Sequence, residues 1–257
     1  MEEGGFCRMA FLQPDAVRTE CGVRISQKII PFGAVWPRST DGFQKGDLDK
    51  ADRLLNGDSG KPTGVCIHNT GRIVVPEGTT PAEQYTRATW PNANMHSVRV
   101  HYYVDHAGAW QNLREDEVGW HAGDGNDGPG NGGMLAIEII MDGSGDEIDR
   151  AAEDNGARLA AALLHRYGLT ADDLHTHYEL SPVKKYCPVY LLPRWEPNRG
   201  KVAAYLDTLR GPQPLYRVQV GAYRERRNAD AMLERLKAAG FDGFIVLPKD
   251  GATKSTE

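Results

Sequence analysis

The chain has 257 residues, enough for one large domain or for a medium domain followed by a small one. Its 40% hydrophobic and 25% charged residues are typical of a globular protein, which excludes collagen-like and wholly disordered chains. The net charge is −5 and the basic residues are scattered, so the sequence does not favour nucleic acid as a partner.

The sequence predicts neither membrane insertion nor a secretion signal. No stretch approaches the roughly 20 apolar residues that span a bilayer. The first residues lack the basic start and the apolar run of a signal peptide, so we expect synthesis in the cytoplasm. The cysteines, Cys7, Cys21, Cys66 and Cys187, are too few and too widely spaced for a disulfide scaffold, and we interpret them as thiols or ligands.

Three short apolar runs predict strands after an N-terminal extension. Residues 1–27 show neither helical nor strand periodicity, so we treat them as the extension. Residues 64–67 form an apolar run that ends at His68, where we expect a polar loop. The runs at 98–104 and 134–141 are rich in β-branched or aromatic residues and short enough for strands.

A glycine-rich segment and two helices complete the predicted elements of the main domain. Residues 119–133 contain seven glycines in fifteen positions, which predicts a loop. It lacks the Gly-Lys-Ser/Thr ending of a phosphate-binding loop, so we do not expect nucleotide binding. The spacing of apolar residues predicts helices over 149–167 and 201–209.

The C-terminal part of the sequence predicts a small separate piece. Residues 211–214, Gly-Pro-Gln-Pro, are typical of a short stiff linker. Beyond them, alternating apolar residues predict strands over 216–220 and 244–247, on either side of a helix. We therefore expect a β-α-β piece at 215–248, followed by a polar tail at 249–257.

Two histidines and one cysteine indicate a candidate metal site. His68 follows an apolar strand, and His177 and Cys187 bracket a polar segment. Two imidazoles and one thiolate, with a fourth position left for water, form a pattern of catalytic zinc. Nine residues separate His177 from Cys187, which is no short-range zinc signature, so spacing alone leaves structural histidines and a buried thiol as the commoner alternative.

Five short sequence motifs resemble those of a known family. In chain order they are Ile67-His68-Asn69-Thr70, His101-Tyr102-Tyr103-Val104-Asp105, Trp120-His121-Ala122-Gly123, Ile137-Glu138-Ile139 and Lys185-Tyr186-Cys187-Pro188. Together they resemble the zinc-dependent N-acetylmuramoyl-L-alanine amidases of the amidase-2 superfamily, which includes peptidoglycan recognition proteins and many phage endolysins. The resemblance covers about residues 28–210 and is nearest to prophage amidases of Gram-positive bacteria, clostridial ones especially. It implies an α/β fold with a central mixed β-sheet flanked by helices.

The resemblance implies a Zn²⁺ site. The family's two zinc histidines fall on His68 and His177, and its zinc cysteine falls on Cys187. The segment between the second histidine and the cysteine is about two residues longer than is usual in the group, so we interpret 180–183 as an insertion. His175 is the alternative ligand if this segment folds otherwise.

The resemblance also implies two reacting groups. Glu138 matches the acidic residue of the family's Ile-Glu-Ile strand and would act as a general base, taking a proton and passing it to the leaving amine. Lys185 matches the lysine of its Lys-x-Cys-Pro word and would stabilise the oxyanion. The alternatives are a buried carboxylate paired for structure and an ordinary loop lysine.

Further side chains are candidates for substrate contact or support. His121 is expected to line the groove and contact the muramoyl group, although a packing histidine is nearly as common. Trp120 and Trp90 have the flat faces that stack on sugars. His101 is a candidate supporting residue of the zinc site. Cys66 shares the strand face of His68, and we interpret it as a small buried hydrophobe.

The C-terminal piece resembles the first half of a SPOR module, which is associated with glycan strands of peptidoglycan. The resemblance covers about residues 214–248 and rests on the words Tyr216-Arg-Val-Gln-Val-Gly-Ala-Tyr223 and Leu236-Lys-Ala-Ala-Gly-Phe241. A piece this small has a marginal core, so it must pack on the amidase domain, dimerise or stay partly ordered.

The leading hypothesis is a zinc amidase that cleaves between N-acetylmuramic acid and L-alanine of peptidoglycan. As a prophage endolysin it would act on the wall after holin-type release or lysis. One alternative is a non-catalytic peptidoglycan-binding protein, against which the presence of Cys187 argues. The other is a cytoplasmic amidase that recycles muropeptides.

Overall fold

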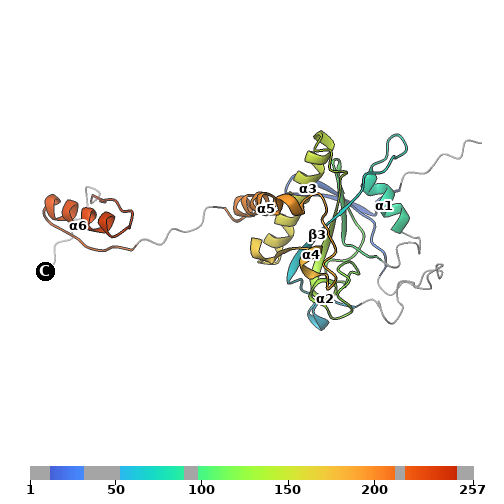
Figure 1. Cartoon of the computed structure of the whole chain (residues 1–257), viewed down its shortest axis with the longest axis horizontal. Helices are drawn as coiled ribbons and strands as arrows, with labels where there is room; N and C mark the ends of the chain where they lie inside the picture. Colours follow the sequence, from blue (N-terminus) through green and yellow to red (C-terminus); the bar gives the residue numbers. More distant parts are fainter. Residues whose placement is uncertain (1–11, 32–52, 90–97, 212–217, 248–257) are drawn as a thin grey trace, which may run out of the picture. The chain divides into compact units, whose positions relative to one another are not determined.

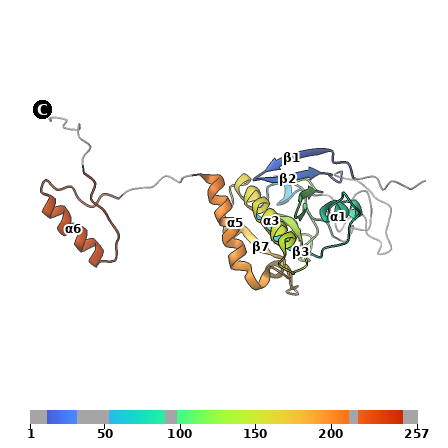
Figure 2. The same ribbon diagram turned by 90° about the horizontal axis from the view of Figure 1, so that it is seen from above.

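A seven-stranded mixed β-sheet organises the first of two units. The structure is a computed structural model that describes residues 12–31, 53–89, 98–211 and 218–247. The first unit is Met1–Pro212 and the second is Gln213–Glu257. In the first unit, helices lie on both faces of the sheet (Figures 1 and 2). This confirms the predicted α/β fold with a central mixed sheet.

The strand order of the sheet is β1-β2-β5-β4-β6-β3-β7. The parallel pairs are β2 with β5, β4 with β6, β6 with β3 and β3 with β7, whereas β1 with β2 and β4 with β5 are antiparallel. The strands are β1 (Ala16–Glu20), β2 (Val23–Gln27), β3 (Gly64–Thr70), β4 (Tyr102–Asp105), β5 (Gly108–Gln111), β6 (Met134–Ile140) and β7 (Leu174–Thr176).

Residues 16–27 differ from the expected extension, because they form a hairpin at the edge of the sheet. Strand β2 pairs with β5, with Ile25 opposite Ala109. The turn residues Cys21 and Gly22 have φ values of 48° and 78°, as two-residue hairpin turns require. Strand β1 is mostly exposed on both faces, and an edge strand of this kind carries no alternation that sequence analysis could detect.

The helices divide between the two faces of the sheet. Helices α3 and α5 pack together over one face, whereas α1 packs on β4 and β5 at the other (Figure 2). The helices are α1 (Pro81–Thr89), α2 (Pro129–Gly133), α3 (Glu147–Arg166), α4 (His177–Leu180), α5 (Trp195–Arg210) and α6 (Arg226–Ala238), with short 3₁₀ turns at Gly57–Ser59, Ala171–Asp173 and Leu192–Arg194.

The two longest helices were predicted with shifted ends. Helix α3 begins after Asp146, whose side chain accepts a hydrogen bond from the backbone N–H of Asp149, and Gly168 follows it with φ +68°. Helix α5 begins at Trp195, six residues before the predicted start, because Pro197 is tolerated in a first helical turn. Part of the predicted glycine loop, residues 129–133, forms the short helix α2.

Alternation along the central strands separates the core from the opposite face. Val65 and Ile67 of β3 join the large apolar core under α3 and α5, together with the odd-numbered residues 135, 137 and 139 of β6. Ala136 and Ile140 belong to a smaller cluster that includes Ala82 of α1. The even-numbered side chains of β3 and β6 therefore point away from the large core.

Helix α3 approaches β6 closely at one glycine. A Cβ on Gly156 would lie 2.4 Å from Cδ1 of Ile139, so only glycine allows this separation between helix and strand. Helix α3 therefore packs against the odd-numbered face of β6, and the even-numbered side chains of β6 lie on the other face of the sheet.

In the second unit, α6 is the only helix or strand among residues 218–247. The predicted strand over 244–247 is absent, and the described part of the strand over 216–220 is also without pairing; residues 216 and 217 lie outside the described ranges. Both segments have the alternating pattern of strands, but a strand needs a hydrogen-bonded neighbour. Apolar side chains of the described part of this unit are exposed, including Val218, Phe241 and Phe244.

No helix in the described ranges combines the length and the apolar character that crossing a membrane requires.

Candidate metal centre

The register of two parallel strands brings His68 and Glu138 together. Strand β3 pairs with β6 along its whole length, and His68 stands directly opposite Glu138. Both side chains leave the sheet on the face away from the large core, because both positions are even-numbered on their strands. The predicted loop at His68 is instead the continuation of β3, which ends at Thr70.

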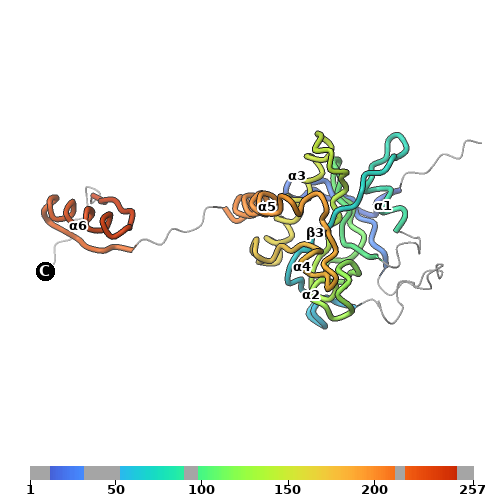
Figure 3. The backbone as a smooth tube through the Cα atoms, in the orientation of Figure 1, coloured from blue at the N-terminus to red at the C-terminus, as the bar shows by residue number. Residues whose placement is uncertain are grey.

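His177 reaches the same place from the other side of β3. Strand β7 pairs with β3, with Thr176 opposite Ile67, and the chain turns into α4 immediately afterwards. Thr176 and Glu179 form a capping box that fixes the start of α4 at His177. Helices α2 and α4 lie next to each other, and α4 also contacts β3, as the backbone trace in Figure 3 shows.

A compact turn returns Cys187 to the ligand histidines. Ser181 N–H donates to the carbonyl of His177, and Lys184 N–H donates to the carbonyl of Ser181. The carbonyl of Cys187 then accepts a 2.8 Å hydrogen bond from Tyr178 N–H. The longer segment at 180–183 is thus accommodated by the end of α4 and the turn that follows it.

The three predicted zinc ligands converge with metal-binding atoms facing one another. Nδ1 of His68 lies 3.0 Å from Nδ1 of His177 and 3.9 Å from Sγ of Cys187. The bond lengths of zinc place two nitrogen ligands about 3.3 Å apart and a nitrogen and a sulfur about 3.6 Å apart in a tetrahedral site. The observed separations fit this donor set. His175 is outside the group, and its Nδ1 lies 3.8 Å from a carboxylate oxygen of Glu179.

Burial sets the protonation of the ligands. It lowers the pKa of His177 to about 4, with a further contribution from the charge of Lys185, and lowers the pKa of His68 well below its usual value. Both imidazoles are therefore neutral at pH 7, the form that binds metals. Burial raises the pKa of Cys187 to about 11, so metal binding there must displace the thiol proton.

Glu138 has the environment of a proton acceptor in a desolvated site. Burial raises its pKa to about 8, although the charge of Lys185 acts in the opposite direction. Its Oε2 is buried and has no hydrogen-bond partner within the described ranges. A carboxyl group whose pKa lies near neutrality can both accept and return a proton.

A pocket of about 170 Å³ opens over the three ligands. Glu138, His121 and Lys185 are among its lining residues, together with Tyr186 and Val189. Trp120, predicted to contact substrate, is not among them; it is half-buried and its backbone pairs with Arg99. Trp90 lies outside the described residues.

The glycine-rich segment holds His121 in the pocket through Asn131. The backbone N–H groups of His121 and Ala122 donate to Oδ1 of Asn131, at 2.7 and 2.8 Å. Asn131 is fully buried and lies in α2, whose backbone N–H groups at Gly130 and Asn131 donate to Asp124. Gly119 is also required, because a Cβ there would lie 2.9 Å from the ring of His121.

His101 has both ring nitrogens occupied away from the ligands. Its Nε2 lies 2.8 Å from the carbonyl oxygen of Glu117, and its Nδ1 accepts from Ala136 N–H at 3.0 Å. Its ring meets that of His121 edge to face, with 6.5 Å between centroids. His101 therefore supports the wall that carries His121 and touches none of the three predicted ligands.

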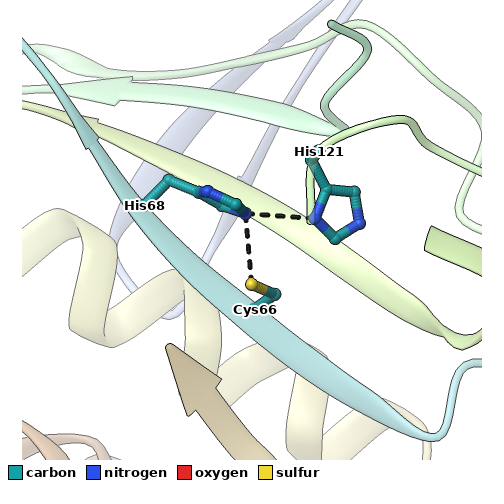
Figure 4. A group of neighbouring side chains, drawn as sticks. All are labelled: Cys66, His68 and His121. Carbon is teal, nitrogen blue, oxygen red and sulfur yellow. Dashed lines mark hydrogen bonds between the residues drawn. The ribbon is translucent and has the colours of Figure 1, made fainter. Parts of the chain in front are cut away.

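Sequence analysis gave Cys66 only a packing role, but this residue also lies beside His68. Cys66 is fully buried, and its Sγ is 3.1 Å from Nε2 of His68 (Figure 4). The signal was the spacing of two residues along one strand, which puts both side chains on the same face. Cys7 lies outside the described residues, and Cys21 is a free thiol.

Comparison with known proteins identifies two regions. Residues 58–190 match the family described as N-acetylmuramoyl-L-alanine amidase, and residues 198–247 match the SPOR domain, which begins within α5. N-acetylmuramoyl-L-alanine amidase XlyB of Bacillus subtilis is 30% identical over 145 residues, covering 56% of this chain and 43% of that protein. N-acetylmuramoyl-L-alanine amidase CwlA of the same species is 29% identical over 149 residues, covering 57% of this chain and 51% of that protein.

A solved structure agrees with these sequence matches. A mutant endolysin from Bacillus subtilis superposes with a TM-score of 0.53 at 27% identity, covering 70% of this chain and 99% of the endolysin chain. The chain spans about half the length of the two curated relatives. The family match covers more than half of the 257 residues and includes the strands β3, β4 and β6 and the three converging ligands. The chain belongs to the N-acetylmuramoyl-L-alanine amidase family.

Proposed function

We propose that this protein hydrolyses the amide bond between N-acetylmuramic acid and L-alanine in peptidoglycan, with a zinc ion held by His68, His177 and Cys187. The observation that carries the proposal is the convergence of two imidazole nitrogens and one sulfur beside the carboxyl group of Glu138, whose Oε2 is buried. Family membership supports the reaction, and the donor spacing supports the metal. Bound zinc would polarise the scissile carbonyl and supply a water-derived nucleophile at neutral pH.

In this proposal Glu138 transfers a proton from the attacking water to the leaving group. A carboxylate with a pKa of about 8 accepts the proton that the attacking water loses and then gives it to the nitrogen of the leaving L-alanine. No group among the described residues donates a hydrogen bond to its buried Oε2, so this oxygen is available to accept the proton from water.

Lys185 supplies positive charge at the mouth of the pocket. Its side chain lines the pocket, and its charge is one of the influences on the pKa values of Glu138 and His177. We assign it to the oxyanion that develops as the amide carbonyl is attacked, where a positioned cation stabilises negative charge. His121, which also lines the pocket, contacts the muramoyl side of the substrate in this arrangement.

We further propose an endolysin role, in which the enzyme meets the wall after holin-type release. Similarity to an endolysin of Bacillus subtilis supports it. The SPOR match supports glycan binding by the C-terminal unit. A chain that ends at Arg210 should then sediment less with purified cell walls than the full chain; equal sedimentation would contradict wall targeting by this unit.

The decisive experiment combines metal analysis with mass spectrometry of digested peptidoglycan. We expect about one tightly held zinc per chain, and free N-acetylmuramoyl glycans with peptides that begin at L-alanine. Glu138→Gln should retain zinc but lower turnover by about 10²-fold or more, the scale of general base catalysis. Cys187→Ala should lose both zinc and turnover.

The exposed Glu77 provides the matched control, since Glu77→Gln changes a carboxyl group away from the pocket. Intact peptidoglycan after incubation with zinc-loaded protein would indicate the non-catalytic binding alternative. Cleavage of soluble muropeptides without cleavage of intact walls would indicate the recycling alternative.

A further inference from the structure

The reaction proposed above leaves one cysteine beside the site unused. Cys66 is fully buried on the same face of β3 as His68. Its Sγ lies 3.1 Å from Nε2 of His68, the ring nitrogen opposite to the one that faces His177 and Cys187. His68 therefore has a sulfur atom near each of its two nitrogens.

His121 completes a group of three around Nε2 of His68. Nδ1 of His121 lies 3.1 Å from that nitrogen, and the two rings meet edge to face with 5.1 Å between centroids. Figure 4 shows Nε2 of His68 pointing toward both Sγ of Cys66 and Nδ1 of His121. The three metal-binding atoms lie within 4.8 Å of one another, and all three residues are buried.

This second group has the donor set of the first. Each contains two imidazole nitrogens and one cysteine sulfur, and His68 belongs to both. The nitrogen–nitrogen separation of 3.1 Å is close to the roughly 3.3 Å of a tetrahedral zinc site, and the nitrogen–sulfur separation of 3.1 Å is within about half an ångström of the expected 3.6 Å. Thiolate and imidazole together select borderline and soft ions such as Zn²⁺ and Cd²⁺.

We propose that Cys66, His68 and His121 form a second site for a thiophilic divalent ion, which shares His68 with the first site. Two ions would bind on opposite nitrogens of one imidazole ring. Binding of the second ion displaces the thiol proton of Cys66 and the remaining N–H proton of His68. Two of the three ligands, His68 and His121, line the pocket, which is the side from which an ion would enter.

The second ion has a consequence for turnover, and this consequence rests on the proposed function. A metal on Nδ1 of His121 would fix the orientation of the ring and remove that nitrogen from any contact with substrate. Excess Zn²⁺ should therefore lower the rate of peptidoglycan hydrolysis, and Cys66→Ser should relieve this inhibition while one zinc per chain remains bound.

Cadmium titration tests the site without using turnover. The background protein carries Cys7→Ser and Cys21→Ser, so that only Cys66 and Cys187 can give a sulfur-to-cadmium charge-transfer band. After removal of metal with a chelator, Cd²⁺ is added and the bound ion is counted by equilibrium dialysis. We expect two Cd²⁺ per chain, and a twofold loss of both absorbance and stoichiometry in either Cys66→Ser or Cys187→Ser.

One bound Cd²⁺ in the background protein, with absorbance unchanged by Cys66→Ser, would overturn the proposal and leave Cys66 as a hydrogen-bond partner of His68. Circular dichroism verifies that each variant is folded. If Cys66→Ser does not fold, the ¹¹³Cd resonance spectrum of the unsubstituted chain decides, because two sites give two sulfur-shifted resonances and one site gives one. If Cys187→Ser leaves the absorbance of the background protein unchanged while Cys66→Ser abolishes it, the result would contradict the zinc ligands of the proposed function but support the second site.

Discussion

The raised pKa of Glu138 predicts that the stability of the metal-free protein falls with rising pH and that one substitution removes this fall. Burial raises the pKa of the carboxyl from 4.5 to about 8. The folded-state value lies above the unfolded one, so the folded state retains a proton that the unfolded state releases. The free energy of unfolding that this group contributes is therefore complete below about pH 4.5 and is lost as the pH rises through about 8.

The magnitude follows from the two pKa values. One pKa unit corresponds to about 1.4 kcal/mol, so the difference between 4.5 and about 8 corresponds to about 5 kcal/mol. Only part of this free energy is lost between pH 5 and pH 8, because the transition extends beyond that range. Solvent at the half-buried side chain of Glu138 reduces the contribution further, so the expected fall in the free energy of unfolding is about 2–3 kcal/mol. The buried histidines act in the opposite sense below about pH 6.5, because burial lowers the pKa of His101 and of His177 to about 4.

Urea unfolding of chelator-treated protein at several pH values measures the effect. All five tryptophans belong to the first unit, so their fluorescence reports this unit alone. The difference between wild type and Glu138→Gln cancels the histidines, and Glu77→Gln is the exposed control. Parallel pH profiles for wild type and Glu138→Gln would refute the desolvation of this carboxyl group.

Three further substitutions test the packing around the site and the role of Lys185. Gly156→Ala should lower the free energy of unfolding by about 1–3 kcal/mol, because the new Cβ would lie 2.4 Å from Ile139 Cδ1; an unchanged urea midpoint would contradict the close packing. Asn131→Leu should lower it by about 2–4 kcal/mol, because two buried N–H groups lose their acceptor, whereas Asn131→Asp keeps that oxygen and should cost less in the same assay. Lys185→Met should lower kcat for the proposed hydrolysis by about 10²-fold with zinc content unchanged; a normal kcat would remove Lys185 from the reaction.

The chemistry of the site was easier to predict from sequence than its surroundings. The words around His68, Glu138 and Cys187 carry the family resemblance, and the three predicted ligand atoms do lie together. The strand register that places His68 opposite Glu138 depends on contacts between distant segments, and no local pattern encodes it. Trp120 is not among the residues that line the pocket, and its contact with substrate stays a prediction.

The errors at both ends of the chain have physical causes. Residues 16–20 form an edge strand without a buried face, so they lack the alternation on which strand prediction rests. Residues 244–247 have that alternation but no paired neighbour in the structure, and pattern alone does not make a strand. Sequence spacing also placed Cys66 on the face of His68, yet only the conformation of the His68 ring shows which nitrogen the sulfur approaches.

The alternation of side chains between the two faces of β3 and β6 has a practical consequence for protein engineering. Residues 65, 67, 135, 137 and 139 belong to the large core, so a library that randomises them explores thermal robustness with little direct effect on chemistry. His68 and Glu138 are the residues of these two strands on the opposite face that line the pocket, so changes there alter reactivity instead. Because the two sets alternate along the same strands, their effects on stability are expected to couple, and combined variants must be measured together.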